Sequence, residues 1–87
     1  MINITIELMA ALRNPFPNKK RKHEINLQST LLLSTLLSNI GFEKKELDHL
    51  ISIVNGIRVN LFEYTVKNND QIFITLPFGG GIRTFGG

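Results

Sequence analysis

Two stretches near the N-terminus alternate between apolar and polar residues. The first covers residues 2–8 and the second residues 23–28. Alternation with a period of two is typical of a strand that buries one face. Pro15 and Pro17 lie between the two stretches, and proline continues neither a helix nor a central strand. The pattern predicts two antiparallel strands joined by an exposed loop at residues 13–22.

The leucine-rich stretch that follows has the spacing of an amphipathic helix. Its apolar positions are Leu32, Leu33, Leu36, Leu37 and Ile40. Ser29 or Thr30 is predicted to cap the N-terminus of this helix, and Gly41 stands where a left-handed C-cap is expected. Residues 42–49 are charged, and we expect either a short second helix or an irregular link there.

The second half of the chain predicts three further strands. They are expected at residues 50–54, 57–61 and 71–76. Asn55-Gly56 separates the first two and is a strong signal for a type I′ hairpin turn, which needs positive φ at both positions. Pro77 ends the last strand because it cannot donate to a sheet. The elements predict an α+β fold, a mixed sheet of four to five strands covered by one main helix.

Alternation also predicts which side chains face the core. The expected inward set is Ile4, Ile6, Ile25, Leu27, Ile72 and Ile74. Phe73 lies between two members of this set and is therefore expected to point away from the core. An outward phenylalanine is either an anchor for a binding partner or a tolerated surface aromatic.

Glycine is concentrated at one end of the sequence. Five of the seven glycines lie in the last nine residues: Gly79, Gly80, Gly81, Gly86 and Gly87. Eighty-seven residues form one small domain, and 43% hydrophobic against 20% charged residues argues against a disordered chain. We expect a domain at residues 1–77 and a flexible tail at residues 78–87.

The net charge of +3 belongs to one loop. Four of the ten basic residues are consecutive, at positions 19–22, so the remaining six face seven acidic residues. A nucleic-acid-binding domain usually spreads Lys and Arg over a face, which argues against that function. The basic run is interpreted either as a solvated loop or as an electrostatic contact with an acidic protein or nucleic acid. Without a basic leader or a long apolar run, we expect a cytoplasmic protein with no membrane contact.

Residues with catalytic chemistry are few. The chain has no cysteine, which excludes a thiolate nucleophile or a cysteine metal site of its own. His23 and His49 belong to different predicted elements, and no metal-binding set or catalytic triad surrounds either one. We therefore expect neither an enzyme nor a bound metal or cofactor.

Several short motifs, in order, resemble a known family. They are Ala11-Leu12-Arg13 after the first strand, Val54-Asn55-Gly56, Asp70 before Ile72-Phe73-Ile74, and Leu76-Pro77-Phe78-Gly79-Gly80. With the helix beginning near Ser29, they resemble the ubiquitin-like β-grasp fold and, more closely, the MoaD/ThiS sulfur carriers. The resemblance covers residues 2–81.

The resemblance implies a carrier whose C-terminal glycine is adenylated by an E1-like enzyme with ATP and then becomes a thiocarboxylate. A synthase of molybdopterin or thiamine biosynthesis would accept the sulfur. Unlike the family pattern, six residues follow the motif-aligned glycines. The working end is expected to be Gly87 with Gly86, or Gly81 or Gly80 after processing; as a third alternative, the extension disables the activity. The residues expected to contact partners are Phe73, Phe78, Arg83 and Phe85.

Two other functions remain open at this point. A ubiquitin-like modifier would use the same activated glycine to form isopeptide bonds with lysines. A β-grasp binding module would instead carry an inert tail and use the basic run at positions 19–22 to contact RNA or an acidic protein.

Overall fold

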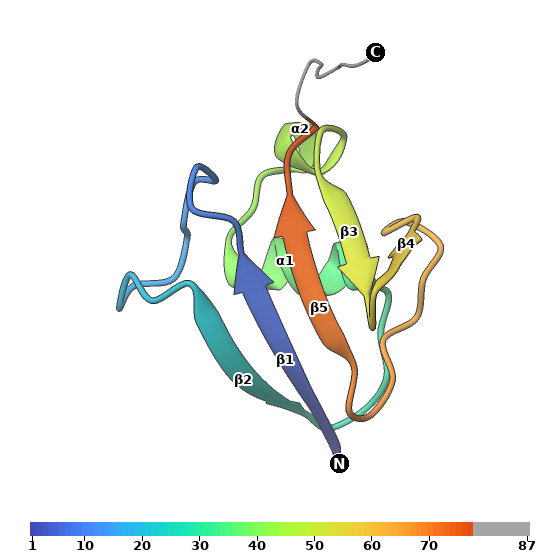
Figure 1. Cartoon of the computed structure of the whole chain (residues 1–87). Coiled ribbons are helices and arrows are strands. Elements are labelled where there is room, and N and C mark those ends of the chain that lie inside the picture. Colours follow the sequence, from blue (N-terminus) through green and yellow to red (C-terminus); the bar gives the residue numbers. More distant parts are fainter. Residues whose placement is uncertain (78–87) are drawn as a thin grey trace.

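Five strands and two short helices make up residues 1–77, the part of the chain that the computed structural model describes (Figure 1). The strands are β1 (Ile2–Leu8), β2 (Lys22–Leu27), β3 (Ile51–Val54), β4 (Ile57–Val59) and β5 (Gln71–Thr75). The helices are α1 (Leu33–Ile40) and α2 (Lys44–Leu47).

The strands form one mixed sheet in the order β2-β1-β5-β3-β4. β1 and β5 lie side by side in the middle and run parallel, although they come from opposite ends of the described chain. Every other neighbouring pair is antiparallel. The predicted α+β fold with a mixed sheet of up to five strands and one main helix is confirmed.

The core lies between the sheet and α1, which covers one face of it (Figure 1). α1 contributes Leu33, Leu36 and Leu37, all buried. The predicted inward residues of the two central strands are buried: Ile4, Ile6, Ile72 and Ile74. Ile25 and Leu27 pack against the same cluster but are only half-buried, because β2 is an edge strand.

The start of α1 differs from the prediction. Neither Ser29 nor Thr30 caps the helix; Leu32 is its N-cap residue and makes no side-chain capping bond. The first two helical N–H groups donate instead to the backbone carbonyls of Leu61 and Tyr64, both at 2.9 Å. A distant loop therefore satisfies donors that a local side chain usually satisfies.

The turn predictions are confirmed more closely. Asn55 and Gly56 have φ of 53° and 84°, as a type I′ turn requires, and they join β3 to β4. Gly41 caps the C-terminus of α1 with φ of 131°. The charged link contains the short helix α2, but β4 ends at Val59, so the predicted strand is two residues too long. Within residues 1–77, neither helix has the length and apolar character needed to span a bilayer.

Candidate functional site

Among residues 1–77, no helix covers the sheet face opposite α1 (Figure 1), and this open face brings together side chains from all five strands. The register pairs Lys22 with Glu7, Glu7 with Phe73, Phe73 with Ile53, and Ile53 with Arg58. Paired residues project to the same face of a sheet. These five residues, hereafter the central row, cross the sheet from one edge to the other. Charged residues lie at both ends of the row, and the apolar residues lie between them.

β3 reverses the usual distribution of polar and apolar side chains. Ser52 points into the core and is 1% exposed, whereas Ile51 and Ile53 are only half-buried on the open face. The Ser52 hydroxyl has no hydrogen-bond partner among the described residues. An open face of an antiparallel pair is ordinarily polar. Ile51, Ile53 and Phe73 therefore form an apolar patch on the open face.

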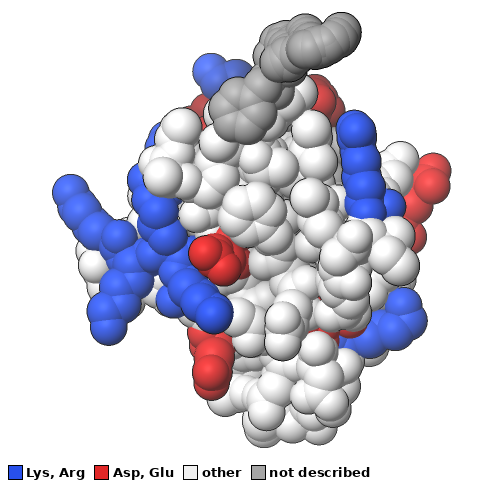
Figure 2. Space-filling view, viewed as in Figure 1, with Lys and Arg blue, Asp and Glu red and all other residues white. Residues whose placement is uncertain are grey.

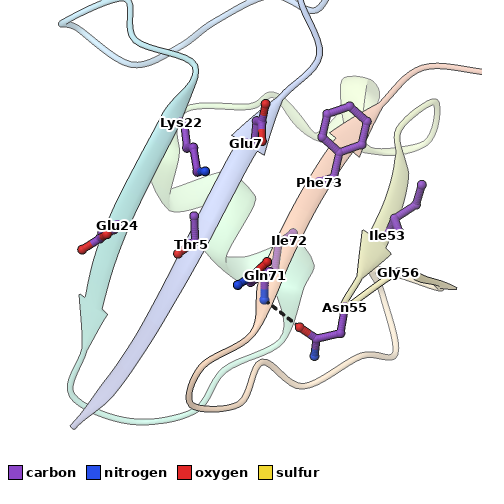
Figure 3. Close-up of a pocket in the computed structure, with 10 residues that line it drawn as sticks. All are labelled: Thr5, Glu7, Lys22, Glu24, Ile53, Asn55, Gly56, Gln71, Ile72 and Phe73. Atoms are coloured by element: carbon purple, nitrogen blue, oxygen red, sulfur yellow. Dashed lines mark hydrogen bonds between the residues drawn. The ribbon is translucent and has the colours of Figure 1, made fainter.

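A shallow hollow of about 520 Å³ runs along this face beside the apolar patch (Figure 3). Phe73 and Ile53 line one side of it, and Glu7, Lys22 and Glu24 line the other. In Figure 3 the Phe73 ring stands out from β5, with the Glu7 side chain beside it on β1. The hollow therefore offers an aromatic anchor next to charges of both signs.

β5 carries the chain to one end of the sheet, where Leu76 leads toward residues 78–87. Met9 holds this end in place: its N–H donates to the carbonyl of Ile74 at 2.9 Å. The Thr75 hydroxyl and the Leu76 N–H donate to the Met9 sulfur at 2.9 and 3.3 Å. The backbone that precedes the glycine-rich sequence is thus fixed against the end of β1.

Asp70 fixes the opposite end of β5. Asp70 is 4% exposed. Its carboxylate accepts hydrogen bonds from the Tyr64 hydroxyl (2.6 Å), the Lys67 N–H (2.8 Å) and the Asn55 amide (2.9 Å). Burial raises the pKa of Asp70, but these hydrogen bonds outweigh burial and leave the pKa below its ordinary value. Burial and the bond to Asp70 raise the pKa of Tyr64 to about 12.

The predicted site residues fall into two groups. Phe73 lies on the open face, as alternation predicted, and its role in partner binding stays a prediction. The other predicted positions lie outside the described residues, as does the predicted flexible tail at residues 78–87. These positions are Phe78, Gly80, Gly81, Arg83, Phe85, Gly86 and Gly87.

Sequence reasoning missed three neighbours of Phe73. Ile51, Ile53 and Glu7 share its face, but the alternation along β3 allowed either Ser52 or the isoleucines to face inward. The hydrophobic pattern alone favours burying the isoleucines. The pairing of β3 with β5 decides against that, and it joins segments far apart in sequence.

The two histidines are held in different places. The His23 ring stacks on Phe16 with ring centroids 3.6 Å apart, and its Nε2 bonds the carbonyl of Lys20 at 2.7 Å. His49 is exposed just after α2. Within residues 1–77, no three side chains gather that could hold a metal ion. The described surface offers apolar contact, hydrogen bonding and charge.

No protein-family model matches the chain, and a search of curated protein sequences finds no match. The sheet topology, the open face and the glycine-rich sequence after Pro77 are thus the observations that bear on function.

Proposed function

We propose that this chain is a β-grasp sulfur carrier, a covalent carrier that an E1-like enzyme activates at a C-terminal glycine. The fold supports the proposal through its sheet order, in which the first and last strands run parallel at the centre and each is flanked by further strands. The main helix crosses the back of that sheet, as it does in the ubiquitin-like β-grasp fold (Figure 1).

The position of β5 is the observation that carries the proposal. This central strand is anchored at Asp70 and at Met9, and it leads directly to a sequence that contains five glycines in its last nine residues. Glycine has no side chain, so an extended glycine segment fits a narrow channel in a partner enzyme. A fixed strand directly before such a segment allows the folded domain to position the C-terminus for another protein.

The chemistry would take place on the terminal carboxylate. Attack of this carboxylate on the α-phosphate of ATP releases pyrophosphate and forms an acyl adenylate. A partner's persulfide then displaces AMP, and a thiol reductant cleaves the resulting acyl disulfide to leave a thiocarboxylate. The sulfur must come from a partner because this chain has no cysteine.

The proposed working end is Gly87, preceded by Gly86, and Gly81 or Gly80 takes that place if the chain is processed. The apolar patch on the open sheet face would dock the activating enzyme, with Phe73 as its aromatic anchor. ATP would be bound by the partner, and a synthase of molybdopterin, thiamine or related biosynthesis would receive the sulfur.

The proposal is tested with the recombinant chain, ATP and each E1-like adenylating enzyme encoded in the same genome. We expect pyrophosphate exchange that depends on the chain and, with a persulfide donor, a mass gain of one oxygen-to-sulfur replacement. Deletion of Gly86-Gly87 should abolish both signals, whereas Gly80→Ala with Gly81→Ala serves as the matched control. If the double Ala variant instead loses both signals and the deletion variant keeps them, the working end is Gly81 or Gly80.

Two results would contradict the carrier function. A full-length chain that supports no exchange and stays unmodified with every such enzyme would rule out activation. A ladder of higher-mass conjugates on lysines, in protein isolated from the native host, would favour the ubiquitin-like modifier.

A further inference from the structure

The basic loop at residues 13–22 is folded against the domain by specific hydrogen bonds. The Arg21 guanidinium donates through Nη1 to the carbonyls of Met9 (2.7 Å) and Leu12 (2.8 Å). Arg21 is only half-exposed, so this cation serves the fold. The three remaining cations of the run, Lys19, Lys20 and Lys22, are exposed and form what we call the lysine cluster.

Two asparagines and an aromatic pair hold the tip of this loop. The Asn14 side chain accepts from the Phe16 N–H at 3.0 Å and donates to the Lys20 carbonyl at 3.1 Å. Asn18 accepts from the Lys20 N–H at 3.0 Å, and the Phe16 ring stacks on His23. The backbone that carries the lysines is therefore fixed before any partner binds, which lowers the entropy cost of binding.

The cluster is kept at a cost in stability. Lys19 has φ of 63°, a left-handed conformation that suits Gly or Asn better than a residue with a long side chain. The ion pairs within residues 1–77 are Arg13–Glu46 and Lys45–Glu43, so no ion pair involves the cluster; Glu7 and Glu24 lie near Lys22, whereas Lys19 and Lys20 belong to the loop itself. Residues held in left-handed backbone conformations cluster at sites that a protein uses for function.

The cluster lies at the end of the sheet from which the chain continues. Met9 accepts the Arg21 hydrogen bond and also holds the end of β5. Lys22 belongs to the central row and lies two strands away from Phe73, with Glu7 between them, which is about 10 Å between backbones. In Figure 2, basic side chains gather at the left margin of the open face, beside acidic groups and a largely uncharged middle.

We propose that the lysine cluster docks an acidic surface of the adenylating enzyme, so that the apolar patch and the glycine-rich segment reach it together. This inference rests on the proposed carrier function. Charges at the rim of an interface mainly raise the association rate and fix the orientation of the partner. The enzyme surface would be acidic opposite the lysine cluster and apolar opposite Phe73 and Ile53.

The surroundings of the cluster favour a protein over a nucleic acid. Glu7 and Glu24 lie on the same face beside Lys22, and their carboxylates would repel a phosphate backbone laid across the sheet. The Phe16 and His23 rings stack on each other, which leaves at most one face of each ring for base stacking. A protein surface can match alternating charges, whereas a uniformly anionic polymer cannot.

A pair of consecutive exposed lysines elsewhere in the chain supplies a matched control. The test compares two double variants. The first combines Lys19→Glu and Lys20→Glu in the basic loop; the second combines Lys44→Glu and Lys45→Glu on α2 and changes the net charge by the same amount. The readout is kcat and KM for the chain in enzyme-dependent pyrophosphate exchange, at low and high salt. We expect KM to rise about tenfold in the first variant at low salt, with unchanged kcat and little remaining salt dependence.

A neutral variant separates docking from folding. Lys19→Asn with Lys20→Gln removes two charges and places at position 19 a residue that accepts left-handed geometry. We expect it to unfold at an equal or higher temperature than the wild type and still to have a raised KM. A raised KM in that folded variant supports docking by the cluster.

Each contrary result has a distinct meaning. Equal KM values for the cluster variant and its α2 control would overturn the inference while leaving the carrier function intact. Absence of exchange with the wild-type chain would overturn both. Binding of a duplex RNA probe that the neutral variant loses, with KM unchanged, would assign the cluster to nucleic acid and overturn the protein-docking proposal.

Discussion

At the scale of single residues, the most informative side chain is the buried hydroxyl of Ser52. It occupies a core position on β3, while Ile51 and Ile53 lie half-buried on the open face. Leaving a buried hydroxyl without a partner costs about 1–3 kcal/mol. β3 therefore places its isoleucines on the open face at a cost in stability.

Ser52→Ala should therefore stabilise the protein. The substitution removes the unpartnered hydroxyl without adding volume, so we expect the free energy of unfolding to rise by about 1 kcal/mol. Urea denaturation of both proteins measures the change. A loss of stability would show that the hydroxyl has a partner after all.

Asp70 contrasts with Ser52, because the buried Asp70 carboxylate accepts three hydrogen bonds. Asp70→Ala removes three of these bonds at once, and we expect a loss of about 3 kcal/mol in the free energy of unfolding. Tyr64→Phe removes one bond and should cost about 1–2 kcal/mol. Thermal and urea unfolding measure both losses. Equal losses in the two variants would contradict a shared network centred on Asp70.

At the scale of elements, one ion pair joins three segments. The Arg13 guanidinium, just after β1, contacts both carboxylate oxygens of Glu46 on α2, at 2.6 and 2.8 Å, and the carbonyl of Gly41 at the end of α1, at 2.8 Å. The Glu46 carboxylate also accepts from the Glu43 N–H at 2.8 Å, which closes a capping box on α2. The side-chain bond from Arg13, followed by the backbone bond from Glu43, lowers the pKa of Glu46 to about 2.

This pair predicts a specific loss of stability in acid. Because the folded-state pKa of Glu46 lies below its ordinary value of 4.5, its contribution is present above pH 4.5 and is lost as the pH falls toward 2. Arg13 is exposed, so solvent screening keeps this contribution to stability small. Glu46→Gln should be less stable than wild type at pH 6 and equal to it near pH 2, as measured by urea unfolding. The exposed Glu63→Gln is the control, and a gap that persists at pH 2 would contradict the assignment.

Local sequence signals located most elements correctly, and distant contacts explain the exceptions. The turn at Asn55-Gly56 and the stop at Gly41 depend on positive φ, which the residue type reveals. The start of α1 depends on carbonyls of Leu61 and Tyr64, and no pattern near the helix reveals them. The same holds for the basic loop, whose order comes from hydrogen bonds of the Arg21 side chain to distant carbonyls.

At the scale of the whole molecule, the candidate site arises from strand pairing. Alternation alone predicted that Phe73 faces outward, because that property is local to β5. The central row depends on the pairing of β1 with β5 and of β5 with β3. A one-residue shift in either pairing would move Glu7 or Ile53 to the other face. Register between distant strands is thus the part of the site that a single sequence does not reveal.

The central position of β5 also has a kinetic consequence. The parallel pair at the middle of the sheet joins segments 65 or more residues apart, as the contacts of Asn3 with Asn68 and of Met9 with Thr75 show. Contacts of such long range form late and slow folding, because a large loop must close first. Until β5 docks, neither the central row nor the apolar patch exists. A partner that must bind this face before it reaches the glycines would therefore not bind the unfolded protein. Binding to the sheet face would then select folded molecules.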